Sequence, residues 1–188
     1  MQITTDTGPS FFIRTTYLKV VKENDIVIDA EFLEEAENDL LNAGFCFACE
    51  RKALDYLSRR EQSRFLLTQK LLSKDFSKQS IQCALDYLEQ KNYLSDERFA
   101  TSWLNTRKIT KAEGRIRLLS ELLSRGIDKA ICNKALDEFF EENSEEEICL
   151  RAIQKYKRLS KSEDKMIPYL IRCGFTNKII QQVLSGKE

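Results

Sequence analysis

The sequence predicts an all-α protein built from tandem repeats of three-helix units. The 188-residue chain contains only two prolines and six glycines, which favours helices over a turn-rich β protein. Apolar residues recur at helical spacing between polar residues that can cap helix N-termini and glycines that can end helices. The same arrangement of three short helices occurs three times, which is typical of a repeat protein whose units stack.

The N-terminal segment is expected to differ from the repeats. Apolar runs at Leu18–Val21 and Ile26–Ile28 flank a polar tetrapeptide, which predicts a small β-hairpin. The polar, Thr-rich residues before it are expected to be partly disordered. An acidic helix should follow, with Asp29 as its N-cap and Gly44 at its stop position. The expected division of the chain is an N-terminal segment at 1–45 and three-helix units at 46–92, 93–142 and 143–188.

Capping residues mark the helices within the three units. In the first unit, Ser63 and Ser77 precede apolar stripes and are expected to be N-caps. In the second unit, Ser95 should cap the first helix, and Asp128 opens the third. Ser144 begins a Ser-x-x-Glu capping box at the start of the third unit.

The last two helices of the third unit have equally clear limits. Because proline is tolerated only in the first turn of a helix, Pro168 places the helix start near Asp164 or Lys165. Gly174 should end that helix, and Thr176 should cap the next one.

The repeat can be read directly from the sequence. The residues from Leu122 to Leu136 match those from Leu170 to Leu184 at a constant offset of 48 residues, including the glycines at 126 and 174. The first unit matches with one slip, and Asp75 stands where the other units have glycine. Aspartate tolerates a left-handed backbone better than most residues, so a similar turn is expected there.

Charge is segregated along the chain although the formal net charge is zero. The net charge is −7 for residues 1–50, +7 for 51–137, −6 for 138–147 and +6 for 148–188. Such segregation produces local fields that attract polyanions or protein surfaces of opposite charge. Any single lysine is nevertheless best interpreted as part of a solvated helix face.

No catalytic, cofactor or metal site is expected. The chain has no histidine, which removes the commonest general base and metal ligand, and it has no Gly-x-x-x-x-Gly-Lys phosphate-binding loop. Cys46 and Cys49 form a Cys-x-x-Cys pair, but no second pair follows at zinc-ribbon spacing. With no signal peptide and no apolar run of membrane-spanning length, we expect a soluble, cytoplasmic protein. The protein is also expected to be a monomer and, because no catalytic constellation is present, not an enzyme.

Several stretches resemble the RecX family of bacterial recombination regulators. The most specific is Tyr93-Leu94-Ser95-Asp96-Glu97-Arg98-Phe99-Ala100. The others are Leu57–Ser63, Lys70-Leu71 with Phe76, Gly114-Arg115-Ile116, Glu121-Leu122 with Gly126-Ile127, and Tyr169–Arg172 with Gly174-Phe175. Together they span about residues 51 to 185, which is most of the chain.

The resemblance implies an elongated, curved array of three-helix units. It also implies binding to the RecA recombinase filament on DNA, along its groove, with modulation of its ATPase, strand-exchange and co-protease activities in DNA repair and the SOS response. The leading hypothesis is therefore a non-enzymatic regulator of RecA that acts by occupying the groove. The alternatives are a stand-alone helical protein that binds single- or double-stranded DNA, and a helical scaffold for another protein partner.

Basic side chains that lie off the apolar stripes are the candidate contacts with RecA or DNA. Arginine can bond a carboxylate or a phosphate through two N–H groups at once. Phe99 and Trp103 are interpreted as core residues rather than as a platform for stacking bases, and Arg107 is ambiguous because it follows their stripe. The candidates are Arg59, Arg60, Lys70, Lys74, Arg98, Arg107, Lys108, Lys111, Arg115, Arg117 and Arg125.

Overall fold

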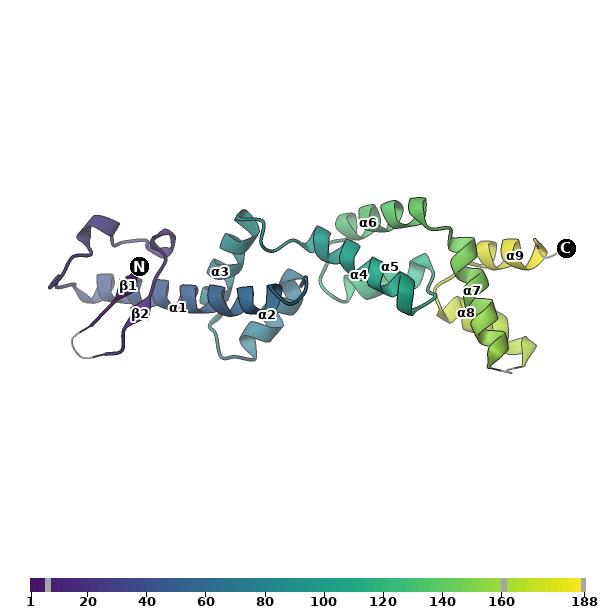
Figure 1. Ribbon diagram of the computed structural model, residues 1–188, viewed down its shortest axis with the longest axis horizontal. Helices are drawn as coiled ribbons and strands as arrows, with labels where there is room; N and C mark the ends of the chain where they lie inside the picture. The colour runs from purple at the N-terminus through teal and green to yellow at the C-terminus, as the bar shows by residue number, and fades with distance from the viewer. Residues whose placement is uncertain (6–7, 160–161, 187–188) are drawn as a thin grey trace. The chain divides into compact units, whose positions relative to one another are not determined.

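The computed structural model describes residues 1–5, 8–159 and 162–186 and confirms the all-α class (Figure 1). Within those residues the chain forms nine α-helices and one two-stranded sheet. The helices divide into two compact units, Met1–Ser95 and Asp96–Glu188, which are described separately below. From here on, the first and second units are these two, and a group of three helices is called a set. The predicted division into four segments stays a prediction.

The predicted N-terminal hairpin is wrong in its position. The antiparallel strands are β1 (Gln2–Ile3) and β2 (Phe11–Phe12), and Ile3 pairs with Phe11. The residues predicted as strands instead flank a short 3₁₀ helix, η2 (Glu23–Asp25). Another 3₁₀ helix, η1 (Thr15–Tyr17), follows β2. Residues 1–16 were expected to be partly disordered, but Ile13 is buried in the core of the first unit; residues 6 and 7 of that stretch lie outside the described residues.

Long-range contacts explain why residues 18–28 do not pair as strands. The carboxylate of Asp39, on the following helix, accepts hydrogen bonds from the backbone N–H groups of Lys19, Val20 and Val21, with N–O distances of 2.8–3.1 Å. Those N–H groups are therefore not available to a strand partner. The segment is held against the helix as an irregular loop.

The acidic helix begins later and ends later than predicted. Helix α1 spans Glu34–Leu57 with Leu33 at its N-cap, so Asp29 is not the cap and Gly44 does not end the helix. The buried stripe continues past Gly44 through Cys46, Cys49 and Ala53, and this packing carries the helix onward. Gly44 is needed for close approach, because a Cβ at this position would lie 2.7 Å from the Phe11 ring.

A buried ionic contact fastens the N-terminal segment to α1. Glu50 is 1% exposed and accepts hydrogen bonds from Arg14 Nε and from the Tyr17 hydroxyl, each at 2.8 Å. The Arg14 guanidinium also lies 4.5 Å from the centre of the Tyr87 ring. The bond to Glu50 raises the pKa of Arg14, and burial followed by the bond to Glu50 raises the pKa of Tyr17, so both stay protonated at neutral pH.

The rest of the first unit is a three-helix set made by α1, α2 (Arg64–Leu72) and α3 (Lys78–Gln90). α3 packs along α1, and α2 contacts both. Ser63 and Ser77 are N-caps as predicted, since their hydroxyls accept hydrogen bonds from the backbone at Leu66 and Ser80. The core of this set is mostly leucine and alanine, and it includes Cys49.

The second unit contains two further three-helix sets. In each set the first helix packs along the third, as in the first unit. Asp128, Ser144 and Thr176 are N-caps as predicted. The one-turn 3₁₀ helix η3 (Glu163–Lys165) leads into the helix that contains Pro168, so that helix starts within two residues of the predicted position. The helices are α4 (Asp96–Thr110), α5 (Arg115–Leu123), α6 (Lys129–Glu142), α7 (Glu145–Arg158), α8 (Met166–Arg172) and α9 (Asn177–Ser185).

The turn that follows the second helix of each set has the same backbone conformation. Asp75, Gly126 and Gly174 have φ values of 63°, 76° and 92°, which is the left-handed region. The sequence predicted this for the two glycines and for Asp75. The three sets therefore share a backbone conformation at this turn as well as a sequence pattern.

A close backbone contact joins the two sets of the second unit. The N–H of Gly114, which precedes α5, donates to the carbonyl of Cys173 at 2.9 Å, and the N–H of Ile116 donates to the carbonyl of Gly174 at 3.2 Å. A Cβ at Gly114 would lie 2.5 Å from Gly174 O, and a Cβ at Gly174 would lie 2.4 Å from Arg117 N. The start of α5 and the end of α8 can therefore meet only because both positions are glycine.

Candidate functional site

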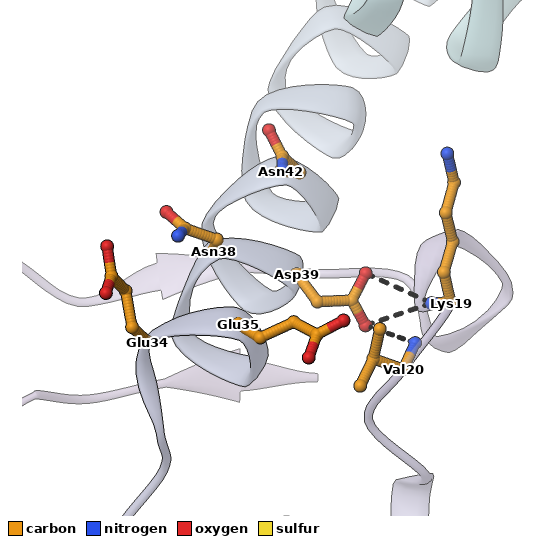
Figure 2. A pocket seen from close by; sticks show the side chains of 7 residues that line it. All are labelled: Lys19, Val20, Glu34, Glu35, Asn38, Asp39 and Asn42. Atoms are coloured by element: carbon orange, nitrogen blue, oxygen red, sulfur yellow. Dashed lines mark hydrogen bonds between the residues drawn. The ribbon is translucent and has the colours of Figure 1, made fainter.

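A surface pocket lies in the first unit where α1 meets the Lys19–Val20 loop (Figure 2). The Asp39 carboxylate in this pocket is already occupied by backbone N–H groups. Burial alone would raise the pKa of Asp39, but these hydrogen bonds outweigh burial and lower it. The remaining lining residues are carboxylates, amides and one lysine, without a nucleophile and base in contact. The lining residues are Lys19, Val20, Glu34, Glu35, Asn38, Asp39 and Asn42.

The Cys-x-x-Cys pair lies in the core of the first unit. Cys46 and Cys49 are buried, and burial raises the pKa of each thiol to about 12. Such thiols are neutral at physiological pH and behave as small apolar side chains. In the part of the chain that the structure describes, no three Cys, Asp or Glu side chains are grouped so that they could hold a metal ion. In the same part, no helix has both the length and the apolar composition to cross a membrane.

The predicted basic residues of the first unit fall into two classes. Arg59 Nη2, just beyond the end of α1, lies 3.1 Å from Oδ1 of Asp55, four residues earlier. Lys70 donates to Gln62 Oε1 at 2.7 Å, and its ammonium lies 5.2 Å from the centre of the Tyr56 ring. Burial, and then the nearby charge of Arg60, lower the pKa of Lys70. Arg59, although exposed, and Lys70 therefore have partners within the unit, whereas Arg60 and Lys74 are exposed without an ion-pair partner among the described residues.

Two predicted arginines of the second unit enclose Trp103. The guanidiniums of Arg107 and Arg125 lie 5.1 Å and 4.8 Å from the centre of its ring. Arg107 Nε lies 3.0 Å from a Glu113 carboxylate oxygen, and Arg125 Nη1 lies 2.7 Å from Glu121 Oε2. The bond from Arg125 outweighs burial and lowers the pKa of Glu121. This half-buried network gives Arg107 and Arg125 contacts within the set, and the role of Arg107 in binding a partner stays a prediction.

Arg115 and Arg117 are also occupied. Arg115 Nη2 pairs with Asp137 at 2.6 Å. Arg117 Nε pairs with Glu113 at 2.9 Å, and its Nη1 donates to the carbonyl of Arg172 at 3.1 Å. Both side chains thus hold α5 against neighbouring elements. Arg98 is half-buried on α4.

Four of the eleven predicted residues are exposed and have no ion-pair partner among the described residues. Two of them lie at the C-terminal end of α4 in the second unit, beside the exposed Ile109. Lysines at such an end are favoured by the helix dipole, but that interaction leaves their charge open to solvent. The four residues are Arg60, Lys74, Lys108 and Lys111.

Helix α7 adds three cations that are not among the eleven predicted residues. Arg151, Lys155 and Arg158 follow one another at spacings of four and three residues, so they form one row on α7 outside its buried stripe. All three are exposed, and none has a carboxylate partner in the described ranges. The spacing was visible in the sequence, and it lies in a segment whose net charge is +6.

A hydrogen bond brings the α7 face and the end of α4 together. Arg151 Nη1 donates to the backbone carbonyl of Lys108 at 3.3 Å, although the two residues are 43 positions apart. The exposed cations of α7 and those at the end of α4 are therefore linked by this contact between two helical sets. We call this group the basic surface: Lys108, Lys111, Arg151, Lys155 and Arg158.

The basic surface has the chemistry of a site for phosphates or carboxylates rather than for nucleic-acid bases. Stacking on unpaired bases requires exposed aromatic rings. The strongly exposed aromatic side chains among the described residues are Phe12, Phe45, Phe65 and Tyr93, and all of them belong to the first unit. Lysine and arginine without aromatic neighbours suit a charged backbone or an acidic protein surface.

Comparison with protein families gives two matches within the chain. Residues 49–88 match the family model described as "RecX, first three-helix domain", and residues 95–136 match "RecX, second three-helix domain". These ranges contain the first two three-helix sets except for the N-terminal part of α1 and the last turns of α3 and α6.

Curated relatives agree with this assignment. A protein named "Regulatory protein RecX" from Treponema pallidum (strain Nichols) is 34% identical over 145 residues, which are 74% of this chain and 88% of that protein. The protein of the same name from Chlorobium limicola is 31% identical over 139 residues, which are 71% and 85% of the two chains.

Two crystal structures share the fold. One, of "regulatory protein RecX", has a TM-score of 0.71 at 20% identity and covers 85% of this chain and 81% of its own. The other, of RecX from Lactobacillus salivarius, has a TM-score of 0.66 at 23% identity and covers 76% and 96%. The two matched domains and the relatives above 30% identity confirm the resemblance seen in the sequence: the chain belongs to the RecX family.

Proposed function

We propose that this protein binds the RecA recombinase filament on DNA and inhibits its ATPase, strand-exchange and co-protease activities, and so acts in recombination and the SOS response. Its relatives carry the name regulatory protein RecX, and it shares their three-helix domains. The observation that carries the proposal is the basic surface, because its five exposed cations belong to two segments joined by the Arg151–Lys108 contact and have no carboxylate partner in the described residues. A filament of protein on DNA offers acidic side chains and phosphates along a continuous path.

The proposed mechanism is steric and electrostatic. Each three-helix set can contact a successive position of the filament, so weak contacts add without any single tight site. A chain held in the groove hinders the addition of RecA protomers and the motions that accompany nucleotide turnover. No residue of this protein has to take part in the chemistry of ATP hydrolysis.

The direct test is the single-strand-DNA-dependent ATPase of the cognate RecA with increasing amounts of the protein. We expect the rate and the filament lifetime to fall in a saturable way. An unchanged rate and lifetime at saturating protein would refute regulation of RecA.

The basic surface also gives specific support to the second candidate, a stand-alone DNA-binding protein. Five phosphate contacts would give a slope of about −4 to −5 in log binding constant against log salt for duplex DNA. Binding to DNA alone with that slope, together with an unaffected RecA ATPase, would favour this candidate. If the protein neither binds DNA nor changes the ATPase rate of RecA, the remaining hypothesis is a helical scaffold for another protein partner.

A further inference from the structure

Helix α1 presents apolar side chains to solvent on the face opposite its core. Ala43 and Cys46 are buried between the N-terminal segment and α3. Leu41 and Phe45, four residues apart on the outer face, are 47% and 59% exposed. Two large apolar residues at this spacing form one row on a helix surface. Such a row is a common feature of contact surfaces between proteins.

This apolar row lies in a strongly acidic region. Residues 1–50 contain ten acidic and three basic side chains. Glu34 and Glu37 lie on the same outer face of α1 and have no cationic partner among the described residues. Glu34, at the edge of the pocket in Figure 2, and Glu37 are both exposed, so their charges face solvent. A partner for this face should therefore be apolar in its centre and basic around it.

The chain itself carries a surface of that kind in its third three-helix set. Ile167 and Ile171 on α8 are 39% and 49% exposed and are also four residues apart. Lys165 and Arg172 flank them with exposed side chains that have no acidic partner among the residues described. Residues 148–188 contain nine basic and three acidic side chains.

We propose that copies of this protein associate head to tail, with the outer face of α1 in one copy packed on the α8 face of the next. Rows spaced four residues apart on two helices can interdigitate, and here one row is rimmed by carboxylates and the other by cations. Because the two faces differ, the contact is heterologous, and each end of an associated pair still offers a face to a further copy.

The contact is small, so it is weak, and the protein is monomeric when dilute. It becomes populated where copies are concentrated beside one another, as on a shared polymer. The inference goes beyond the proposed function, since head-to-tail contact would make binding to a filament cooperative. Its test needs neither RecA nor DNA, so its failure and the failure of the proposed function can be told apart.

The experiment is sedimentation velocity of the full chain at low and high salt over about a hundredfold range of protein concentration, ending in the high micromolar range. We expect the mass to rise steadily with concentration at low salt and to fall back at high salt, because salt screens the charged rims. Phe45→Glu and Ile171→Glu should each abolish the rise. Leu123→Glu, which changes an exposed apolar residue of α5, is the matched control and should not.

Mixing the two defective variants distinguishes head-to-tail contact from other arrangements. Phe45→Glu retains an intact α8 face and Ile171→Glu retains an intact α1 face, so an equimolar mixture should form a pair and stop there. A wild-type protein that stays monomeric at every concentration would overturn the proposal. This result is expected if the outer face of α1 instead packs on another part of the same chain or on a different, basic protein. Association that survives either substitution, or a mixture that stays monomeric, would overturn it as well.

Discussion

Substitution of Gly174, in the turn between α8 and α9, should destabilise the second unit through two separate effects, the backbone conformation and a steric clash. Alanine at this position would have to adopt φ = 92°, which costs about 1–2 kcal/mol for an L-residue. Its Cβ would also lie 2.4 Å from Arg117 N and from Arg117 Cβ, and relieving such a clash costs about 1–3 kcal/mol. We therefore expect Gly174→Ala to lower the free energy of unfolding by about 2–5 kcal/mol.

Two matched variants separate the contributions. Gly114 has φ = −83°, so Gly114→Ala retains only the clash with Gly174 O and should cost about 1–3 kcal/mol. Gly174→Asn tolerates the left-handed backbone but keeps the clash, so it should be less harmful than Gly174→Ala.

The assay is urea unfolding followed by tryptophan fluorescence. Trp103 is the only tryptophan of the chain and lies in the second unit, so its emission reports on that unit. An unchanged midpoint for both Gly174→Ala and Gly114→Ala would refute the close contact between α5 and α8.

Three predictions concern the first unit and the attachment of its N-terminal segment. Asp39→Ala leaves the backbone N–H groups of Lys19–Val21 without an acceptor, so it should cost about 3 kcal/mol and speed hydrogen exchange at those amides. Glu50→Ala leaves Arg14 and Tyr17 without their shared acceptor and should cost about 3–5 kcal/mol, measured by urea unfolding, whereas Glu50→Gln should cost less. Because the folded pKa of Asp39 is lowered, its contribution to stability is complete above its unfolded pKa and is lost as the pH falls through the folded value. In Asp39→Asn this pH-dependent contribution to stability should be missing, as measured by acid unfolding followed by circular dichroism. An acid transition identical to that of the wild type would contradict the role of the Asp39 carboxylate.

Local rules predicted the helix starts and turns of the repeats. Ser63, Ser77, Ser144 and Thr176 cap helices because a hydroxyl can bond a free N–H within its own turn, whatever packs around it. Asp75 was predicted to share the left-handed turn of the two glycines for a similar reason. Information of this kind is contained in a few neighbouring residues.

The errors occurred where distant residues decide the structure. Gly44 resembles a helix stop, but the Phe11 ring fills the space beside it and the helix continues. The apolar runs around residue 22 resemble a hairpin, but Asp39 occupies the N–H groups of the first run. Neither contact can be inferred from local spacing.

The candidate site shows the same division. The sequence identified the basic residues but could not tell which of them were paired. Arg117 bonds the carbonyl of Arg172, 55 residues away, whereas Lys111 has no ion-pair partner in the described part of the chain. The contact between Arg151 and Lys108 likewise required the fold, although the row of cations on α7 could have been found from its spacing.

The measurement that tests the central claim most directly compares charge-reversed variants in the ATPase assay of RecA on single-stranded DNA. Arg151→Glu combined with Lys155→Glu removes the middle of the basic surface, and Lys129→Glu reverses an exposed cation on α6 outside it. The two substitutions on α7 should abolish inhibition while helix content is retained, and Lys129→Glu should inhibit like the wild type. Equal inhibition by all three proteins would contradict the assignment of the basic surface as the site that binds the filament.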